Sequence, residues 1–128
     1  MHGKALIFRP DSSAPAETLF DGVVPTLGFL QEAVGGYIEQ VPQFETIETA
    51  EGPVRCVVLC NEQGKLDRLP LNRHATLLWH QAMLRITDED GKRLYPRGLM
   101  QPNSTMPADV LVGPIVVITG DAELMREL

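Results

Sequence analysis

An apolar run at residues 54–60, VRCVVLC, constrains the fold of this chain more than any other feature. Every position of the run except Arg55 is apolar, so both of its faces can be buried. This is the pattern of a strand in the interior of a sheet, and the run is far shorter than the roughly 20 apolar residues of a membrane helix. The sequence therefore predicts a sheet with this strand near its centre.

The length and composition of the chain fit one domain. Its 128 residues, 44% of them hydrophobic, suffice for one sizeable core and are too few for two ordinary domains. We therefore expect residues 1–128 to form a single domain. The beginning of the chain lacks the long apolar region of a signal peptide, and no apolar run has the length of a membrane helix. These observations predict a cytoplasmic protein without a membrane partner.

Three further segments predict strands of the same sheet, at residues 4–9, 37–41 and 110–119. Gly113 and Pro114 lie within the last segment and mark a bulge or an exposed edge, because proline cannot donate to a strand ladder. Exposed edges of this kind would allow a homo-oligomer.

The remaining segments have weaker patterns. The serine-, proline- and alanine-rich stretch after Pro10 predicts a loop, whereas residues 42–53 are ambiguous between a ragged strand and a loop. Residues 84–95 predict a hairpin around the acidic turn at residues 88–91. Residues 96–107 predict a loop rich in proline, glycine, asparagine and serine.

Two main helices are expected. The first opens at Pro25 or Thr26, runs to Val34 and ends at two successive glycines. The second has Asn72 as its N-cap and a buried face on which Trp79 is predicted to be a core residue. Its apolar positions are Leu71, Ala75, Leu78, Trp79 and Ala82.

The expected fold class follows from this order of elements. It is α+β: a single compact domain with a mixed or antiparallel sheet of about four to six strands, packed by two main helices. Asp121 is predicted to cap a short helix at the end of the chain. The order of the strands does not follow from the sequence.

Charge is distributed unevenly along the chain. The net charge is −6, which argues against direct nucleic-acid binding. Residues 11–54 hold eight acidic residues and no lysine, arginine or histidine, whereas basic residues outnumber acidic ones in residues 55–97. Two interpretations stay open: the halves pair across the fold, or the second half presents a cationic surface to an anionic ligand.

The polar, cationic block at residues 61–76, NEQGKLDRLPLNRHAT, is the candidate binding site. Its glycine-lysine pair follows a strand, yet the block lacks the earlier glycine and the following Ser/Thr of a phosphate-binding Walker loop, which excludes an NTPase of that type. Backbone N–H groups near a helix N-terminus, with Lys65 and Arg73 supplying charge, could still hold an anion. The alternative is a turn with solvated side chains. The predicted ligand-binding residues are Tyr37, Asn61, Glu62, Lys65, Asn72, Arg73 and Thr76, with Tyr37 available for stacking.

Metal and catalytic sites find less support. His74 and His80 lie six residues apart, about 240° around a helix, and cannot share one ion. Cys56 and Cys60 point to one face of a strand about 13 Å apart, too far for a disulfide, so we expect two reduced core thiols. We therefore predict no metal and no cofactor. Cys60, with His80 or His74 as its base, is the leading nucleophile, and an enzyme remains the less favoured alternative.

Four sequence blocks together resemble a known family. They are VGGYIE at residues 34–39, VVLCNEQGKL at 57–66, LPLNRHAT at 69–76 and DVLVGPIVVITG at 109–120. In this order they are similar to a domain-of-unknown-function family of small proteins that phages, plasmids and actinobacterial genomes carry. The resemblance covers nearly the whole chain, and many members begin with a strand like KALIFRPD. The resemblance implies a mobile-element setting and a compact α+β domain, and it implies no particular activity. The longer connections at residues 42–53 and 88–107 depart from the family pattern.

Three functional hypotheses remain. The first is a phage- or plasmid-encoded accessory binding protein that sequesters a small anionic, nucleotide-like ligand or counteracts a host defence. The second is an inhibitor that docks on a host protein through the acidic residues 11–51. The third is a small enzyme that uses Cys60 or His80, and it ranks last because no complete set of catalytic groups is visible.

Overall fold

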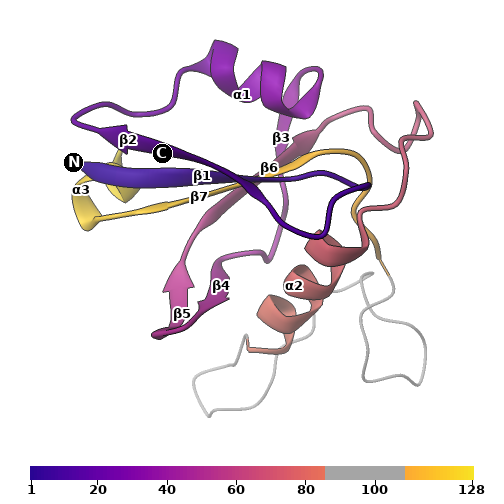
Figure 1. Ribbon diagram of the computed structural model, residues 1–128. Coiled ribbons are helices and arrows are strands. Elements are labelled where there is room, and N and C mark those ends of the chain that lie inside the picture. Colours follow the sequence, from indigo (N-terminus) through magenta and orange to yellow (C-terminus); the bar gives the residue numbers. More distant parts are fainter. Residues whose placement is uncertain (86–108) are drawn as a thin grey trace.

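The computed structural model describes residues 1–85 and 109–128 (Figure 1). The expected loop at residues 96–107 lies outside the described residues, as does most of the hairpin expected at residues 84–95. Leu84 was expected to open that hairpin; it is instead the last residue of a helix.

The centre of the molecule is an antiparallel sheet of five strands in the order β2-β1-β7-β6-β3. The four segments predicted as strands all contribute to it, which confirms the α+β class. The serine-, proline- and alanine-rich loop predicted after Pro10 ends at Ala16, where β2 begins; the sequence did not predict this strand, which pairs with β1 along its whole length. The strands are β1 His2–Phe8, β2 Ala16–Asp21, β3 Ile38–Gln40, β6 Val57–Asn61 and β7 Ile115–Gly120.

The run at residues 54–60 is two strands rather than one. Its start belongs to β5 (Gly52–Arg55), which pairs with β4 (Thr46–Thr49) in a separate two-stranded sheet. Cys56 separates β5 from β6, and its amide donates to the carbonyl of Glu45 at 2.9 Å. The interior position predicted for the run holds for β6, which lies between β7 and β3. The ambiguous residues 42–53 therefore contain β4 and the beginning of β5.

The last strand is central, and Pro114 does not lie at a sheet edge. Strand β7 has β1 on one side and β6 on the other, and its residues Ile115 to Ile118 are all fully buried. Pro114 precedes the strand, so its missing N–H removes no hydrogen bond from the ladder. Among the described strands, β2 and β3 lie at the edges of the sheet, and a homo-oligomer stays a prediction.

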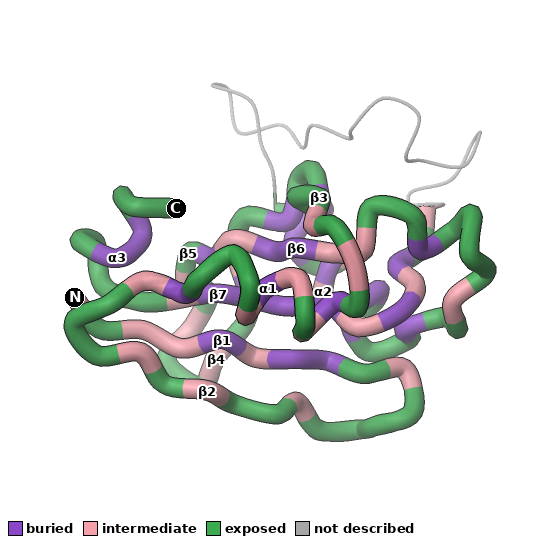
Figure 2. Tube along the Cα trace, turned by 90° about the horizontal axis from the view of Figure 1, so that it is seen from above, coloured by how far each residue is buried: buried purple, intermediate pink, exposed green. Residues whose placement is uncertain are grey.

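Helices cover both faces of the sheet (Figure 1). Helices α1 (Leu27–Val34) and α3 (Ala122–Arg126) lie on one face, where Leu30, Val34 and Leu124 join a core cluster with residues of β1, β6 and β7. Helix α2 (Arg73–Leu84) and the β4-β5 hairpin cover the other face. From above, buried segments follow β1, β7 and β6, whereas β2 is largely exposed (Figure 2). None of the described helices is long and apolar enough to cross a membrane.

The three predicted helix starts are confirmed by their caps. The side chains of Thr26, Asn72 and Asp121 each accept a hydrogen bond from the amide three residues later. Gly35 ends α1 with a φ of 79°, a left-handed conformation that glycine adopts without a Cβ penalty. The prediction that the glycine pair stops the helix is therefore correct.

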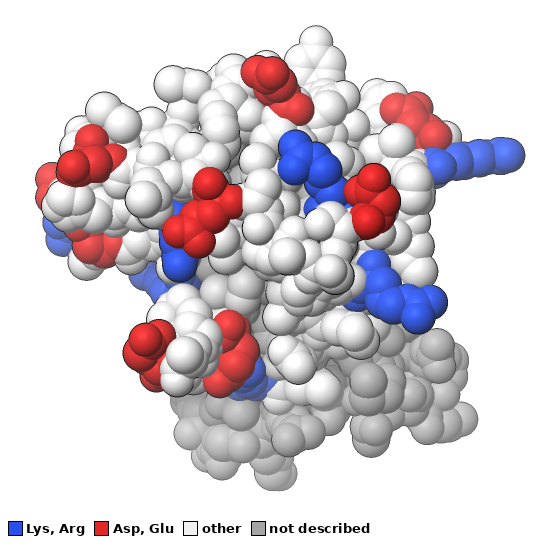
Figure 3. All heavy atoms as spheres, viewed as in Figure 1, with Lys and Arg blue, Asp and Glu red and all other residues white. Residues whose placement is uncertain are grey.

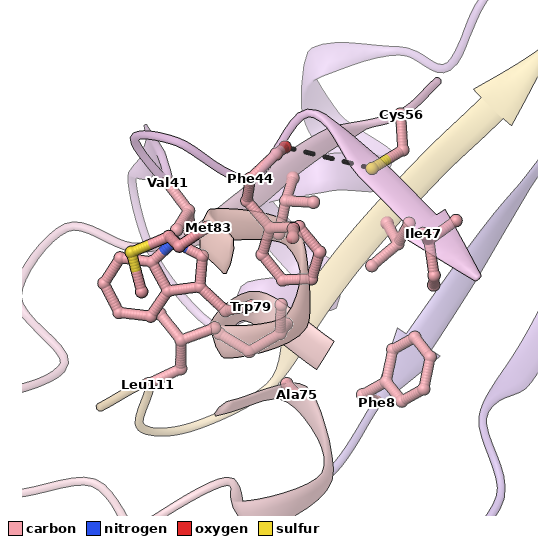
Figure 4. Packing of buried hydrophobic residues seen from close by; sticks show 13 residues of the cluster. Phe8, Val41, Phe44, Ile47, Cys56, Ala75, Trp79, Met83 and Leu111 are labelled. Atoms are coloured by element: carbon pink, nitrogen blue, oxygen red, sulfur yellow. Dashed lines mark hydrogen bonds between the residues drawn. The ribbon is translucent and has the colours of Figure 1, made fainter. Parts of the chain in front are cut away.

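The core on the α2 side is built around Trp79. Figure 4 shows the indole beside Met83, Val41 and Leu111, with Phe44 farther along the same cluster. Trp79 and Met83 are almost completely buried, which confirms the prediction of a core tryptophan. The thiol of Cys56 donates to the carbonyl of Phe44 at 3.8 Å, and both cysteines are free.

Candidate ligand-binding cleft

A cleft of about 230 Å³ opens where β3 and the end of β6 meet α2 and the approach to β7. Part of its lining is apolar: Val41, Pro42, Trp79, Val110, Leu111 and Val112. The rest is polar or charged: Glu39, Gln40, Cys60, Asn61, Glu62, Lys65 and Asp109. Mixed linings of this kind are typical of small-molecule sites, where apolar groups supply contact area and a few polar groups set orientation.

Two neighbouring residues of α2, Trp79 and His80, hold two parts of the cleft wall, at Pro42 and at Asp109. Trp79 donates from Nε1 to the carbonyl oxygen of Pro42 at 2.8 Å. His80 donates from Nε2 to the carbonyl oxygen of Asp109 at 2.8 Å; a carbonyl only accepts, so Nε2 carries the proton. Both parts of the wall are thus fixed to one helix before any ligand binds, which lowers the ordering cost of binding.

Asn61 shapes the turn at the end of β6. Its Nδ2 donates to the carbonyl of Val34 at 3.3 Å, and its Oδ1 accepts from the amide of Gln63 at 2.9 Å. A Cβ at Gly36 would lie 2.9 Å from the Asn61 Nδ2, so glycine is needed there for this side chain to approach α1. Asn61 therefore lines the cleft while its side chain stabilises the turn.

The charged groups of the cleft are mainly acidic. Lys65 forms an ion pair with Asp109, whose Oδ1 also accepts from the amide of Val110 at 2.8 Å. Glu39 and Glu62 form no ion pair with any residue that the structure describes. Three carboxylates against one ammonium give the described lining a formal charge of −2.

The Cys60 thiol faces the cleft in its protonated form. Burial, together with the neighbouring Glu39 carboxylate, raises its pKa to about 11, and Lys65 opposes the two. Glu39 is paired with Cys60 across β3 and β6, which places it beside the thiol. Neither histidine of the predicted catalytic pairs is bonded to Cys60: the His80 ring bonds Asp109, and the His74 ring packs edge-on against Phe8. This arrangement does not activate a nucleophile.

Two of the predicted site residues are buried and bonded to the backbone. Asn72 donates from Nδ2 to the carbonyls of Phe8 at 2.8 Å and Gly113 at 2.9 Å, besides capping α2. Thr76 donates to the carbonyl of Asn72 at 2.7 Å and accepts from the amide of Leu111 at 2.9 Å. Their side chains join α2 to β1 and to the approach of β7, and leave no exposed polar group for a ligand.

The structure therefore separates the predicted binding residues. Asn61, Glu62 and Lys65 line the cleft. Arg73 lines a second hollow of about 510 Å³, more open to solvent, together with Asn72, His74, Leu77 and residues 10–13. Tyr37 is 70% exposed and belongs to neither. Lys65 and Arg73 thus do not face one common ligand.

Residues that the sequence interpretation did not assign complete the cleft. Glu39 and Asp109 come from segments far apart in the chain, and Trp79 was assigned to the core alone. The alternation of residues 37–41 gives Glu39 and Tyr37 the same side of a strand, but only the pairing with β6 places Glu39 beside Cys60. No local signal in the sequence indicates that pairing.

The charge asymmetry along the chain does not produce one cationic face in the view of Figure 3, where acidic and basic side chains are interspersed. The Arg85–Glu48 ion pair links the two halves, as the pairing interpretation expects. Arg55, Arg68 and Arg73 form no ion pair with described residues. Pairing across the fold therefore accounts for part of the asymmetry.

Comparison with known proteins supplies a family. No curated protein and no solved structure shows significant similarity to the chain. The model of one family, described as "Domain of unknown function (DUF3846)", matches residues 1–127. The chain therefore belongs to the DUF3846 family.

Proposed function

We propose that this protein is a non-catalytic binding protein that holds a small molecule in the cleft between β3, β6 and α2. The observation that carries the proposal is the fixed position of two parts of the cleft wall, because Trp79 and His80 hold Pro42 and Asp109 through hydrogen bonds of 2.8 Å. A cavity that is formed before binding, with apolar and charged lining, is the usual form of a small-molecule site.

Binding is favoured over catalysis by the chemistry of the lining. A nucleophile needs a lowered pKa or an adjacent base, and the pKa of Cys60 is raised instead. His80, which is hydrogen-bonded to a lining residue, uses Nε2 to hold the backbone carbonyl of Asp109. The described lining therefore lacks the coupled groups of general acid–base or nucleophilic catalysis.

The size of the cleft limits the ligand. Its volume of about 230 Å³ lies below the ~300–1,000 Å³ of sites for drug-sized molecules. A fragment-sized metabolite, or one part of a larger ligand, fits this space. A nucleotide-like anion would have to draw Lys65 away from Asp109, since Lys65 is the one basic residue of the described lining.

The biological setting belongs to the same proposal. The blocks at residues 57–66 and 109–120, which resemble proteins carried by phages and plasmids, supply most of the polar lining of the cleft. We place the protein in the host cytoplasm as an accessory protein of a mobile element. Its function would then be to bind and sequester a small host molecule, such as a defence signal, without catalysing a reaction.

A thermal-shift screen with a cleft-filling variant tests this proposal. The panel contains small amines, carboxylates, neutral aromatics and mononucleotides. A ligand at 100 times its Kd raises stability by about 2.7 kcal/mol, which is easily measured. Val110→Phe fills the cleft from its lining, and Val23→Phe makes the same change at an exposed valine outside it. We expect at least one panel compound to stabilise the wild type and Val23→Phe but not Val110→Phe; equal shifts in all three proteins would exclude the cleft as the site.

A further inference from the structure

We propose that the cleft selects a ligand with a protonated nitrogen, an amine or a guanidinium, attached to an apolar body. This inference rests on the proposed function and names the chemical class that the same cleft takes. It replaces the anionic ligand expected from residues 61–76, because the fold brings carboxylates rather than cations to the place where Asn61, Glu62 and Lys65 lie.

The distribution of charge in the cleft is the first argument. Lys65 is paired with Asp109, which leaves Glu39 and Glu62 as the charged groups of the described lining without an ionic partner. Both side chains are exposed, so water solvates their charges and the free protein carries no desolvation penalty for them. A cation that enters the cleft is attracted by these carboxylates, by about 1 kcal/mol for each one that it approaches to 4 Å even in water.

The apolar part of the lining is the second argument. Val41, Trp79 and Leu111 are buried residues that also line the cleft, and Val110 adds an exposed apolar side chain. A small inorganic cation would leave this surface in contact with water. A ligand that carries an apolar body covers it, at a gain of about 25 cal/mol for each Å² removed from water.

The position of Lys65 is the third argument. Its ammonium touches the carboxylate of Asp109, and the backbone of Asp109 is held in turn by His80. An anionic ligand would have to break this ion pair and would meet Glu39 and Glu62 on the way. A cationic ligand leaves the pair intact, so Lys65 acts as part of the wall.

Three phenyl compounds of similar size separate the contribution of charge from that of the apolar body. Phenethylamine is cationic, phenylacetate is anionic and 2-phenylethanol is neutral at pH 7. Trp79 is the single tryptophan of the chain and lines the cleft, so its fluorescence on excitation near 295 nm reports binding directly. We expect phenethylamine to bind at least about 10-fold more tightly than phenylacetate, with 2-phenylethanol between them, and the ratio to shrink as salt is added.

Matched double variants assign the selectivity to the two glutamates. Glu39→Gln/Glu62→Gln should reduce the preference for phenethylamine over phenylacetate to less than about threefold and leave 2-phenylethanol binding unchanged. Glu32→Gln/Glu127→Gln removes the same charge from exposed glutamates outside the cleft and should keep the preference.

The possible outcomes separate the two proposals. Equal binding of all three compounds to the wild type, abolished by Val110→Phe, would overturn the cation inference and keep the cleft as the binding site. Tighter binding of phenylacetate would overturn it in favour of an anionic ligand. If none of the three changes Trp79 fluorescence and the thermal-shift screen is also negative, both proposals fail.

Discussion

The indole N–H of Trp79 and the carbonyl of Pro42 form a 2.8 Å hydrogen bond that joins the centre of α2 to the chain leaving β3. The indole is buried in the core on one side and lines the cleft on the other. One side chain therefore contributes both to the stability of the fold and to the shape of the candidate site.

Trp79→Phe removes this donor and part of the core volume. We expect the free energy of unfolding to fall by roughly 2–4 kcal/mol, because the Pro42 carbonyl loses its partner and a cavity is left. Urea denaturation followed by circular dichroism measures the change. Leu77→Ala on the exposed side of the same helix serves as the control and should change stability by less than about 1 kcal/mol. An equally small effect of Trp79→Phe would contradict the importance of this contact.

Asn72 is expected to be essential for folding rather than for binding. Asn72→Ala removes the cap of α2 and leaves the carbonyls of Phe8 and Gly113 without their donor, at a cost of roughly 2–4 kcal/mol. Asn72→Asp keeps the cap but places a carboxylate against the same two carbonyls, so it should destabilise at least as much at pH 7. Recovery of the Asp variant toward wild-type stability would show that the cap alone matters. Thermal unfolding of both variants decides this.

Thr76 is expected to act through its hydroxyl group. Thr76→Val conserves the shape and removes the acceptor of the buried Leu111 amide, which should cost about 1–3 kcal/mol. Thr76→Ser keeps the hydroxyl and should cost less. Denaturant midpoints compare the two, and a Val variant as stable as the Ser variant would show that the hydrogen bond contributes little.

The Cys60 thiol should react slowly at neutral pH. Its pKa is raised to about 11 by burial and by Glu39, so the thiolate that alkylation requires is rare. In a Cys56→Ala background at pH 9, we expect iodoacetamide to modify folded Cys60 roughly 50-fold more slowly than the unfolded chain, because about half of the unfolded thiol and about 1% of the folded thiol is ionised at that pH. A rate profile with its midpoint near pH 9 in the folded protein would contradict this.

The same shift has a consequence for stability at high pH. Because the pKa of Cys60 is higher in the folded protein than in the unfolded chain, the folded state holds the thiol proton more tightly and is stabilised, relative to alkaline solution, while the thiol is protonated. That contribution is complete below about pH 9 and is lost as the pH rises toward the folded value of about 11, because the unfolded chain ionises first. Cys60→Ser should therefore lose less stability between pH 9 and 11 than the wild type, in denaturation curves measured side by side.

Helix α3 should loosen in acid. The amide of Leu124, followed by that of His2, donates to the Asp121 carboxylate and lowers its pKa from the ordinary value of 3.8. A lowered folded pKa gives a contribution that is present above about pH 3.8 and disappears as the pH falls through the folded value. Amide exchange of Leu124 should accelerate in that range in the wild type. Asp121→Asn keeps a capping oxygen without the charge, and its exchange should depend less on pH.

What the sequence predicts well is local. Thr26, Asn72 and Asp121 are helix caps in the structure because a cap needs only its own next turn. Strand β2 was not predicted and residues 42–53 were left ambiguous, because these segments hold few buried residues: β2 is exposed at most of its positions, and β4 and β5 are half-buried or exposed at most of theirs. Each is a strand through pairing with the neighbouring segment of the chain. The split of residues 54–60 at Cys56 has no local signal either: the apolar run is continuous, but its two parts pair in different sheets.

In the candidate site, too, the sequence predicts local features and misses those that depend on tertiary packing. Asn61 and Lys65 were found because a polar turn after an apolar strand is a local signal. Asn72 and Thr76 carry the same polar signal, yet their partners include the carbonyl of Phe8 and the amide of Leu111, which tertiary packing brings to them. Polarity at a helix entry therefore does not separate a ligand-binding residue from a buried structural one.

The central claim is that the cleft around Trp79 binds the ligand, and an NMR titration of the ¹⁵N-labelled protein tests it most directly. Phenethylamine, or any compound that the thermal-shift screen identifies, is added while backbone amide shifts are followed. The account predicts that the largest changes fall on residues 39–41, 60–65 and 109–112, together with the indole N–H of Trp79. Changes centred instead on residues 10–13 and 73–77, around the second hollow, would contradict it.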